Sequence, residues 1–146
     1  MPLSVAIRLA FACALCCALP SCSKSKPIPS WANATKETVQ MGKPWTFESR
    51  GIKVSGRTTR ASMIMTLALE IESAGPRLRY EDIVAYWDNE ELTFEMPRSG
   101  ELSVSDANGS WKASVKLAKK IPVSPEHDVL YLAVGPAVWE FELLPP

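Results

Sequence analysis

The stretch ASMIMTLALEIE, residues 61–72, decides the fold class of this chain. From Met63 to Ile71 every second residue is large and apolar, and smaller or polar residues occupy most positions between them. Side chains of a β-strand alternate between its two faces, so this period of two predicts a long strand with one buried face. Methionine packs well in cores, so we interpret Met63 and Met65 as core residues and not as copper ligands.

Similar alternation, interrupted by turn signals, continues to the end of the chain. Asn108-Gly109 and Gly135-Pro136 are dipeptides typical of tight turns. Many short strands with short connections favour an all-β domain, and we expect an antiparallel β-sandwich of seven to eight strands, immunoglobulin-like or transthyretin-like. We expect Trp87, Trp111 and Trp139 in its core, because each shares a strand face with apolar residues. The further predicted strands span residues 83–88, 92–96, 101–105, 111–117, 129–134 and 138–143.

The N-terminal 21 residues have the organisation of a secretory leader. Residues 1–8 carry one base, Arg8, and residues 9–19 (LAFACALCCAL) carry no charge. This order predicts a cleaved signal peptide, and the apolar run is much shorter than the roughly 20 residues that span a bilayer. All four cysteines lie at or before Cys22, so the rest of the chain is expected to fold without a disulfide.

The tetrapeptide Leu19-Pro20-Ser21-Cys22, which follows the apolar run, resembles the lipobox of bacterial lipoproteins. In that family the cysteine thiol is lipidated and the leader is cut just before it. The resemblance covers residues 1–22 only, and it implies that Cys22 carries a covalent lipid; no other cofactor is expected. In the same family, Ser23 after the cysteine is compatible with transfer to the outer membrane. We therefore expect a protein of the bacterial cell envelope that faces the periplasm.

Residues 22–44 are predicted to form a flexible, lipid-anchored tether, because serine, lysine and proline dominate and apolar periodicity is absent. The segment Thr35–Met41 is compatible with one or two helical turns ended by Gly42. The folded domain is expected over residues 45–146. Trp31 leaves two alternatives open, since it can rest among lipid headgroups, as interfacial tryptophans do, or pack on the domain.

No motif in the chain predicts catalysis or metal binding. His127 is the sole histidine and its acidic neighbours are adjacent to it in a loop, so we interpret it as a solvated residue. Asp106 and Asn108 beside Gly109 lack the further carboxylates of a calcium loop, and we interpret them as turn residues. We expect a non-enzymatic protein without a small-molecule substrate. The formal net charge of zero also disfavours general nucleic-acid binding.

Counting strands suggests where a partner would bind. If each predicted strand crosses the domain once, loops 88–91, 106–109 and 135–137 share one end. These loops carry acids and no base, although Arg57 and Arg60 are expected near the same end. If residues 45–54 form a single strand, the tether attaches at the opposite end, and the acidic end faces soluble partners. A turn at Ser49-Arg50-Gly51 would move the tether to the acidic end. The candidate partner contacts are Asp88, Glu90, Glu91 and Asp106.

These features predict a membrane-anchored envelope lipoprotein that acts as a binding or scaffold module for another envelope protein. Two alternatives stay open. One is an inhibitor or immunity protein against an envelope-acting enzyme, which a neighbouring toxin gene would favour. The other is a small secretion-system lipoprotein subunit, which a secretion operon would favour.

Overall fold

The structure, a computed structural model, describes residues 31–96, 98–120 and 128–146. These residues form an all-β fold with two short 3₁₀ turns, η1 (Trp31–Asn33) and η2 (Tyr80–Asp82). The strands are β1 (Thr35–Gln40), β2 (Pro44–Ser49), β3 (Ile52–Ala61), β4 (Ile64–Ser73), β5 (Ile83–Trp87), β6 (Glu90–Phe94), β7 (Ser105–Ala107), β8 (Ser110–Lys120), β9 (Val129–Val134) and β10 (Ala137–Leu144).

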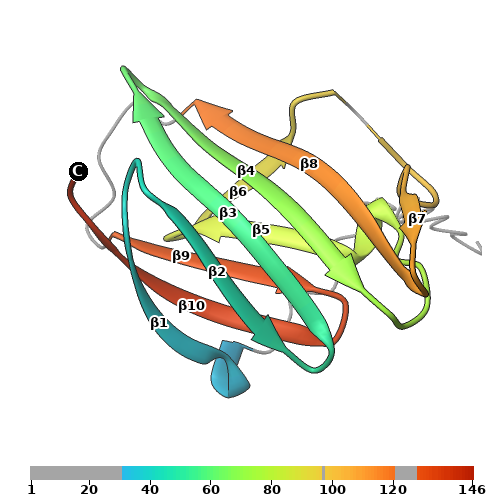
Figure 1. The fold of residues 1–146 in the computed structure, drawn as a ribbon. Coiled ribbons are helices and arrows are strands. Elements are labelled where there is room, and N and C mark those ends of the chain that lie inside the picture. The colour runs from blue at the N-terminus through green and yellow to red at the C-terminus, as the bar shows by residue number, and fades with distance from the viewer. Residues whose placement is uncertain (1–30, 97, 121–127) are drawn as a thin grey trace, which may run out of the picture.

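The strands follow one another in the order β1-β10-β9-β5-β6-β8-β4-β3-β2, and β7 pairs with β8. Figure 1 shows two curved layers that face each other. The first layer contains β2, β3, β4 and β8, the second contains β1, β10, β9 and β5, and β6 joins them. The mixed sheet is nearly closed into a barrel.

The strand predicted from the period of two is β4, which lies at the centre of the first layer. It pairs with β3 on one side and with β8 on the other along its whole length. Met65, Leu67, Leu69 and Ile71 are all buried, as predicted. Met63 is 44% exposed, because it lies in the turn between β3 and β4 and not in the strand. The predicted buried face is therefore confirmed from Met65 to Ile71, and the prediction that Met63 is a core residue is wrong.

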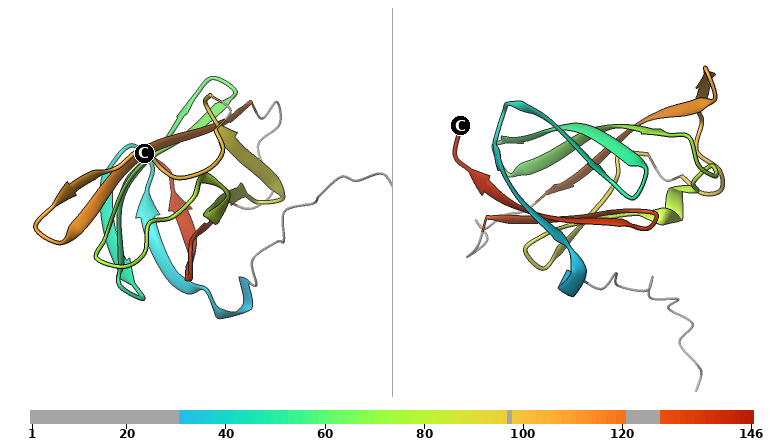
Figure 2. Two further views of the ribbon diagram at one scale, coloured as in Figure 1. Left: turned by 90° about the vertical axis from the view of Figure 1, so that its right-hand side faces the viewer. Right: turned by 60° about the horizontal axis from the view of Figure 1, so that its bottom comes forward.

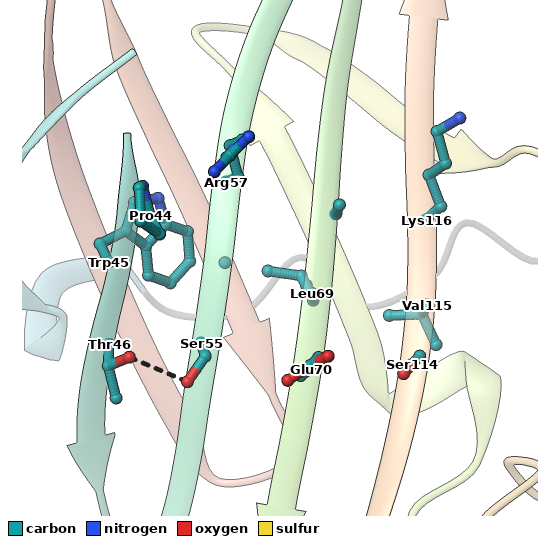
Figure 3. Close-up of a pocket in the computed structure, with 12 residues that line it drawn as sticks. Pro44, Trp45, Thr46, Ser55, Arg57, Leu69, Glu70, Ser114, Val115 and Lys116 are labelled. Carbon is teal, nitrogen blue, oxygen red and sulfur yellow. Dashed lines mark hydrogen bonds between the residues drawn. The ribbon is translucent and has the colours of Figure 1, made fainter. Parts of the chain in front are cut away.

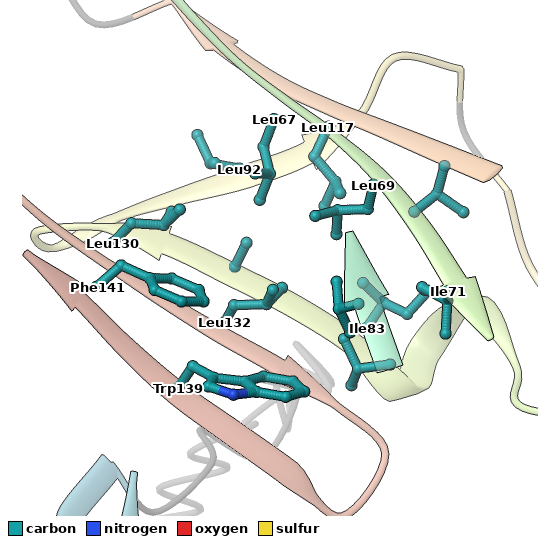
Figure 4. Close-up of a cluster of buried hydrophobic side chains, with 14 of the residues drawn as sticks. Leu67, Leu69, Ile71, Ile83, Leu92, Leu117, Leu130, Leu132, Trp139 and Phe141 are labelled. Carbon is teal, nitrogen blue, oxygen red and sulfur yellow. The ribbon is translucent and has the colours of Figure 1, made fainter. Parts of the chain in front are cut away.

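The core lies between the two layers and contains the three tryptophans that the sequence places there. Trp87, Trp111 and Trp139 are buried. In Figure 4, Leu67 and Leu117 of the first layer point toward Leu130, Leu132 and Phe141 of the second. Fully burying each such side chain contributes about 1.5–3 kcal/mol, which makes this cluster the main source of stability.

The all-β class is confirmed, but the expected antiparallel sandwich of seven to eight strands is wrong in its details. The described residues form a sheet of ten strands, which is mixed because β1 pairs in parallel with β10. The segment Thr35–Met41, expected as a tether with helical turns, supplies that strand. It has little apolar alternation, since only Val39 within β1 is buried. Its backbone hydrogen bonds to β10, which no side-chain pattern records, hold it in place.

The connection from β1 to β2 fastens the barrel at one end. The Met41 backbone N–H donates to the Leu144 carbonyl (2.9 Å), and the Gly42 N–H donates to the Thr58 carbonyl (2.8 Å). Figure 2 shows the chain crossing here from one layer to the other, close to the C-terminus. The N-terminal part of the described chain is therefore integral to the barrel.

Two turns decide which loops share an end. Arg50 and Gly51 have φ values of 52° and 74°, which make a tight hairpin turn between β2 and β3. Residues 45–54 are therefore not a single strand. The predicted strand 101–105 is also wrong, because only Ser105 within it is in a strand and Glu101 makes an isolated bridge to Arg79. Because 101–105 is not a strand that crosses the domain, the chain crosses once fewer than expected between the β5–β6 turn and β7. The loops before and after this region therefore lie at opposite ends.

Candidate functional site

The four acidic loop residues do not form one surface. Asp88 lies in the β5–β6 turn and Glu90 is the first residue of β6, where its carboxylate is 3.7 Å from Lys119 Nζ near the C-terminal end of β8. Asp106 lies in β7, beside the N-terminal end of β8, and forms an ion pair with Arg77. The prediction that these residues share one end is wrong, because the loop that follows β6 does not cross the domain. Their contact with a partner stays a prediction.

Glu91 follows Glu90 in β6 and lies on the outer face of that strand. It is opposite Tyr86 of β5 in the register. The pKa of Tyr86 is raised, first because the phenol is partly desolvated and second because Glu91 is negatively charged. Glu91 thus belongs to the surface of the second layer and not to an acidic loop cluster.

Charge differs between the two layers, and not between the two ends as expected. On the first layer, outward-facing bases exceed acids, whereas on the second layer the outward-facing strand residues include more acids than bases. The bases of the first layer are Lys53, Arg57, Lys112, Lys116 and Lys120, and its acids are Glu48, Glu70 and Glu72. The charged residues of β1, β9 and β10 that face outward are Lys36, Glu140 and Glu142.

A hollow of about 500 Å³ opens on the outer face of the first layer (Figure 3). Two straight rows of side chains, which run across β2, β3, β4 and β8, form its sides. One row is Thr46, Ser55, Glu70 and Ser114, and the other is Pro44, Arg57, Ala68 and Lys116.

The floor of the hollow is strand backbone. The row between its two sides, Trp45, Gly56, Leu69 and Val115, turns its side chains toward the core. Side chains on one face of a strand recur about every 6.6 Å and neighbouring strands lie about 4.8 Å apart, so the hollow is a trough about 7 Å wide and about 14 Å long. We call it the trough below.

Gly56 is required beneath the trough, because the indole ring of Trp45 covers it from the core side. A Cβ atom at Gly56 would lie 2.5 Å from Cη2 and Cζ2 of Trp45. The ring cannot easily move, since it packs against Phe47 and Phe141 at centroid distances of 5.8 and 4.9 Å. Trp45 is 8% exposed, and its Nε1 is buried without a hydrogen-bond partner among the described residues.

Two charged groups of the trough are not engaged by the protein itself. Arg57 and Glu70 make no hydrogen bond or ion pair within the ranges that the structure describes. Lys116 Nζ is 3.1 Å from Glu95 Oε1, and the hydroxyls of Thr46 and Ser55 are hydrogen-bonded at 2.9 Å. An arginine and a glutamate on opposite sides of the trough are therefore available to a ligand.

The aromatic contacts of Trp31 resolve its two alternatives. Its ring centroid is 5.0 Å from that of Tyr131 and 6.1 Å from that of Tyr86. Both tyrosines face outward from β9 and β5, so Trp31 packs on the second layer, on the side of the barrel opposite the trough.

The remaining residues singled out in the sequence are two turn residues, which the structure describes, and Cys22 and His127, which it does not. Asn108 and Gly109 have φ values of 52° and 79° and form the predicted β7–β8 turn. Cys22 and His127 lie outside the described residues. Among the residues that the structure does describe, no group of three or more His, Cys, Asp or Glu side chains is arranged to hold a metal ion.

A comparison with known proteins gives no relatives: no family model, no curated protein and no solved structure matches this chain. No helix within the described residues has the length and apolar character to cross a membrane.

The sequence did not indicate the trough. Its sides come from four strands, so residues up to 72 positions apart, from Pro44 to Lys116, meet only after the strands pair. The one signal present is the short side chain at three outward positions of long strands, namely Ser55, Ala68 and Ser114. Such residues are common on exposed strand faces, and without the register they do not indicate a hollow.

Proposed function

We propose that this chain is a lipid-anchored binding module of the bacterial envelope, and that the trough on the first layer is where it holds a partner protein. The observation that carries the proposal is the trough itself, in which Arg57 and Glu70 have no partner in the described parts of the chain. A hollow of this size is in the range of pockets that hold small ligands, and its length of about 14 Å accommodates a short stretch of an extended chain. Isolated charges at such a site favour recognition by charge complementarity.

The path of the N-terminal segment supports this orientation. Trp31 packs on Tyr131 and Tyr86 of the second layer. Cys22, the proposed lipidation site, is nine residues earlier in the sequence. A chain of that length reaches at most about 32 Å. An anchor that leaves from the second layer turns that layer toward the bilayer and the trough toward soluble partners.

Lipidation of Cys22 is tested by its replacement. We expect Cys22→Ala to lose the mass of the acyl chains and to leave the detergent phase, because the thiol is the proposed attachment point. Intact-mass measurement and detergent partitioning of both forms check this. A variant that keeps the wild-type mass and still partitions with membranes would show that the anchor is elsewhere.

Partner binding at the trough is tested by site-specific photo-crosslinking in intact cells. We expect a crosslinker at Ser114 to capture one defined envelope protein, which a second change, Arg57→Glu, abolishes. A crosslinker at Thr38, exposed on the outer face of β1, is the matched control. Capture from Thr38 but not from Ser114 would place the partner on the other layer and refute the proposal.

A further inference from the structure

The charges around the trough repeat in a fixed order across three neighbouring strands. Arg57 of β3 and Lys116 of β8 lie in one row with Ala68 of β4 between them. Glu70, the next outward residue of β4, lies on the other side of the trough, as Figure 3 shows. The side chain of Ala68 is too short to separate the two bases. A molecule that crosses the strands therefore meets a positive, a negative and a positive group in turn.

The same order occurs in a second row of the same face. Lys53 of β3, Glu72 of β4 and Lys112 of β8 are register partners. They line a second hollow of about 330 Å³, which shares Ser55, Glu70 and Ser114 with the trough, so the two hollows adjoin. In this row Lys112 Nζ is 3.4 Å from Glu72, so part of the charge is already neutralised within the protein. In the trough Lys116 is likewise paired, with Glu95, but Arg57 and Glu70 have no partner among the described residues, so the trough keeps two charges that a ligand can engage.

The shape and chemistry of the trough favour an extended peptide over a sugar chain. Its width of about 7 Å admits one extended chain, whose successive side chains point alternately to the two sides of the trough. Its floor is backbone already hydrogen-bonded within the sheet, so recognition depends on side chains at the two sides. The one aromatic residue among the lining residues, Trp45, is turned into the core and offers no ring face on which a sugar would stack.

We propose that the trough binds an extended segment of a partner protein in which an acidic, a basic and an acidic residue follow one another, so that the two acidic side chains point to one side of the trough and the basic one to the other. The first acidic side chain would pair with Arg57 and the basic one with Glu70. The second acidic side chain would pair with Lys116, in exchange for its exposed ion pair with Glu95. This inference rests on the proposed function, because it assumes a protein partner at this face. It adds the charge order by which that partner is recognised.

The test uses two synthetic peptides with the mature protein purified in detergent micelles. The first peptide has the order Ser-Ser-Glu-Lys-Glu-Ser-Ser, and the second has the inverted order Ser-Ser-Lys-Glu-Lys-Ser-Ser, each with blocked termini. We expect the first peptide to shift backbone amide resonances of β3, β4 and β8 around the trough in NMR titrations. We expect the second to bind at least about tenfold more weakly, because like charges would then face each other.

A charge-swapped variant makes the test specific. In Arg57→Glu/Glu70→Lys/Lys116→Glu the preference between the two peptides should reverse. All three side chains are exposed, so the fold should survive, and a thermal melt checks this. The matched control, Lys43→Glu/Glu142→Lys, changes exposed charges away from the trough and should leave the preference as in wild type.

The outcomes separate this inference from the proposed function. Equal binding of both peptides, or no binding of either, overturns the charge order. If a partner is nevertheless crosslinked through Ser114, the proposed function stands without it. If the peptides discriminate but the control variant abolishes the discrimination, the site lies outside the trough, and the inference is likewise refuted.

Discussion

At the scale of single residues, the most constrained position is Gly56, in the middle of β3. Glycine weakens a strand because it has no side chain to pack. Here its absence of a side chain is what admits the Trp45 ring, which would otherwise be 2.5 Å from a Cβ atom. The ring in turn contacts Phe141 across the barrel. One missing methyl group therefore lets the edge strand β2 share the core of both layers.

We expect Gly56→Ala to destabilise the protein by about 1–3 kcal/mol, the usual cost of inserting a methyl group into a packed core. Urea denaturation followed by tryptophan fluorescence measures the change. Gly75→Ala is the matched control, because a Cβ there would meet only Ser73 Oγ, at 3.4 Å, and stability should change little. Equal effects of the two substitutions would contradict the role of Trp45.

The buried and the half-buried tryptophan should differ in their contribution to stability. Trp139 is 1% exposed, and its ring is stacked on Phe141 at 6.5 Å. Trp139→Ala should therefore cost about 3–5 kcal/mol, as large-to-small core substitutions do. Trp31→Ala should cost clearly less, since that ring is only partly covered. Denaturation midpoints of both variants check this, and a larger effect at Trp31 would contradict it.

At the scale of elements, the turn η2 fixes the loop that replaces the predicted strand at 101–105. The Tyr80 N–H donates to the Gly100 carbonyl (2.8 Å), and the Gly100 N–H donates to Glu81 Oε1 (3.1 Å). Arg79 Nε lies 3.3 Å from the other carboxylate oxygen of Glu81. The segment around Gly100 is therefore held by hydrogen bonds to Tyr80 and Glu81 and not by the ladder of a neighbouring strand.

Stability should depend on the ionisation of Glu81. Hydrogen bonds from backbone N–H groups, its own first and that of Gly100 next, lower the pKa of this carboxyl. Because the folded pKa is below the unfolded one, the stabilisation is complete above the ordinary glutamate range and is lost as the pH falls through the folded value. Glu81→Gln should therefore lose less stability than wild type between about pH 6 and about pH 3, by urea denaturation. An identical loss in both proteins would contradict this.

At the scale of the whole molecule, the N-terminal segment brings the sheet close to a closed barrel. β1 covers the edge of β10, and its connection to β2 is hydrogen-bonded to Leu144 and Thr58. Val39 and Met41 of this segment are buried in the core. The segment that the sequence assigns to the tether is therefore part of the folded unit.

A truncation series tests this boundary. The chain from residue 30 should melt cooperatively. Its midpoint should be indifferent to reductant, since its sequence contains no cysteine, and to EDTA, since the described residues include no group of three or more potential metal ligands. The chain from residue 44 should melt at a clearly lower temperature, because it lacks β1 and two buried side chains. Circular dichroism melts of both forms measure the difference. Equal midpoints of the two forms would show that residues 31–43 do not contribute to the folded unit. A large fall of the midpoint with EDTA would show that the fold depends on a metal ion.

The sequence by itself determined the all-β class, the inward face of β4 and the burial of Trp87, Trp111 and Trp139, because side-chain alternation is local and is recorded residue by residue. It also predicts the lipid anchor at Cys22, which the described residues do not test. Only the tertiary structure decided the parallel pairing of β1 with β10, which depends on backbone hydrogen bonds and not on an apolar pattern. It also decided the trough, because Arg57, Glu70 and Lys116 become neighbours only through the register of β3, β4 and β8. Local patterns specify strands, whereas the pairing partners of those strands specify the surface that the strands present.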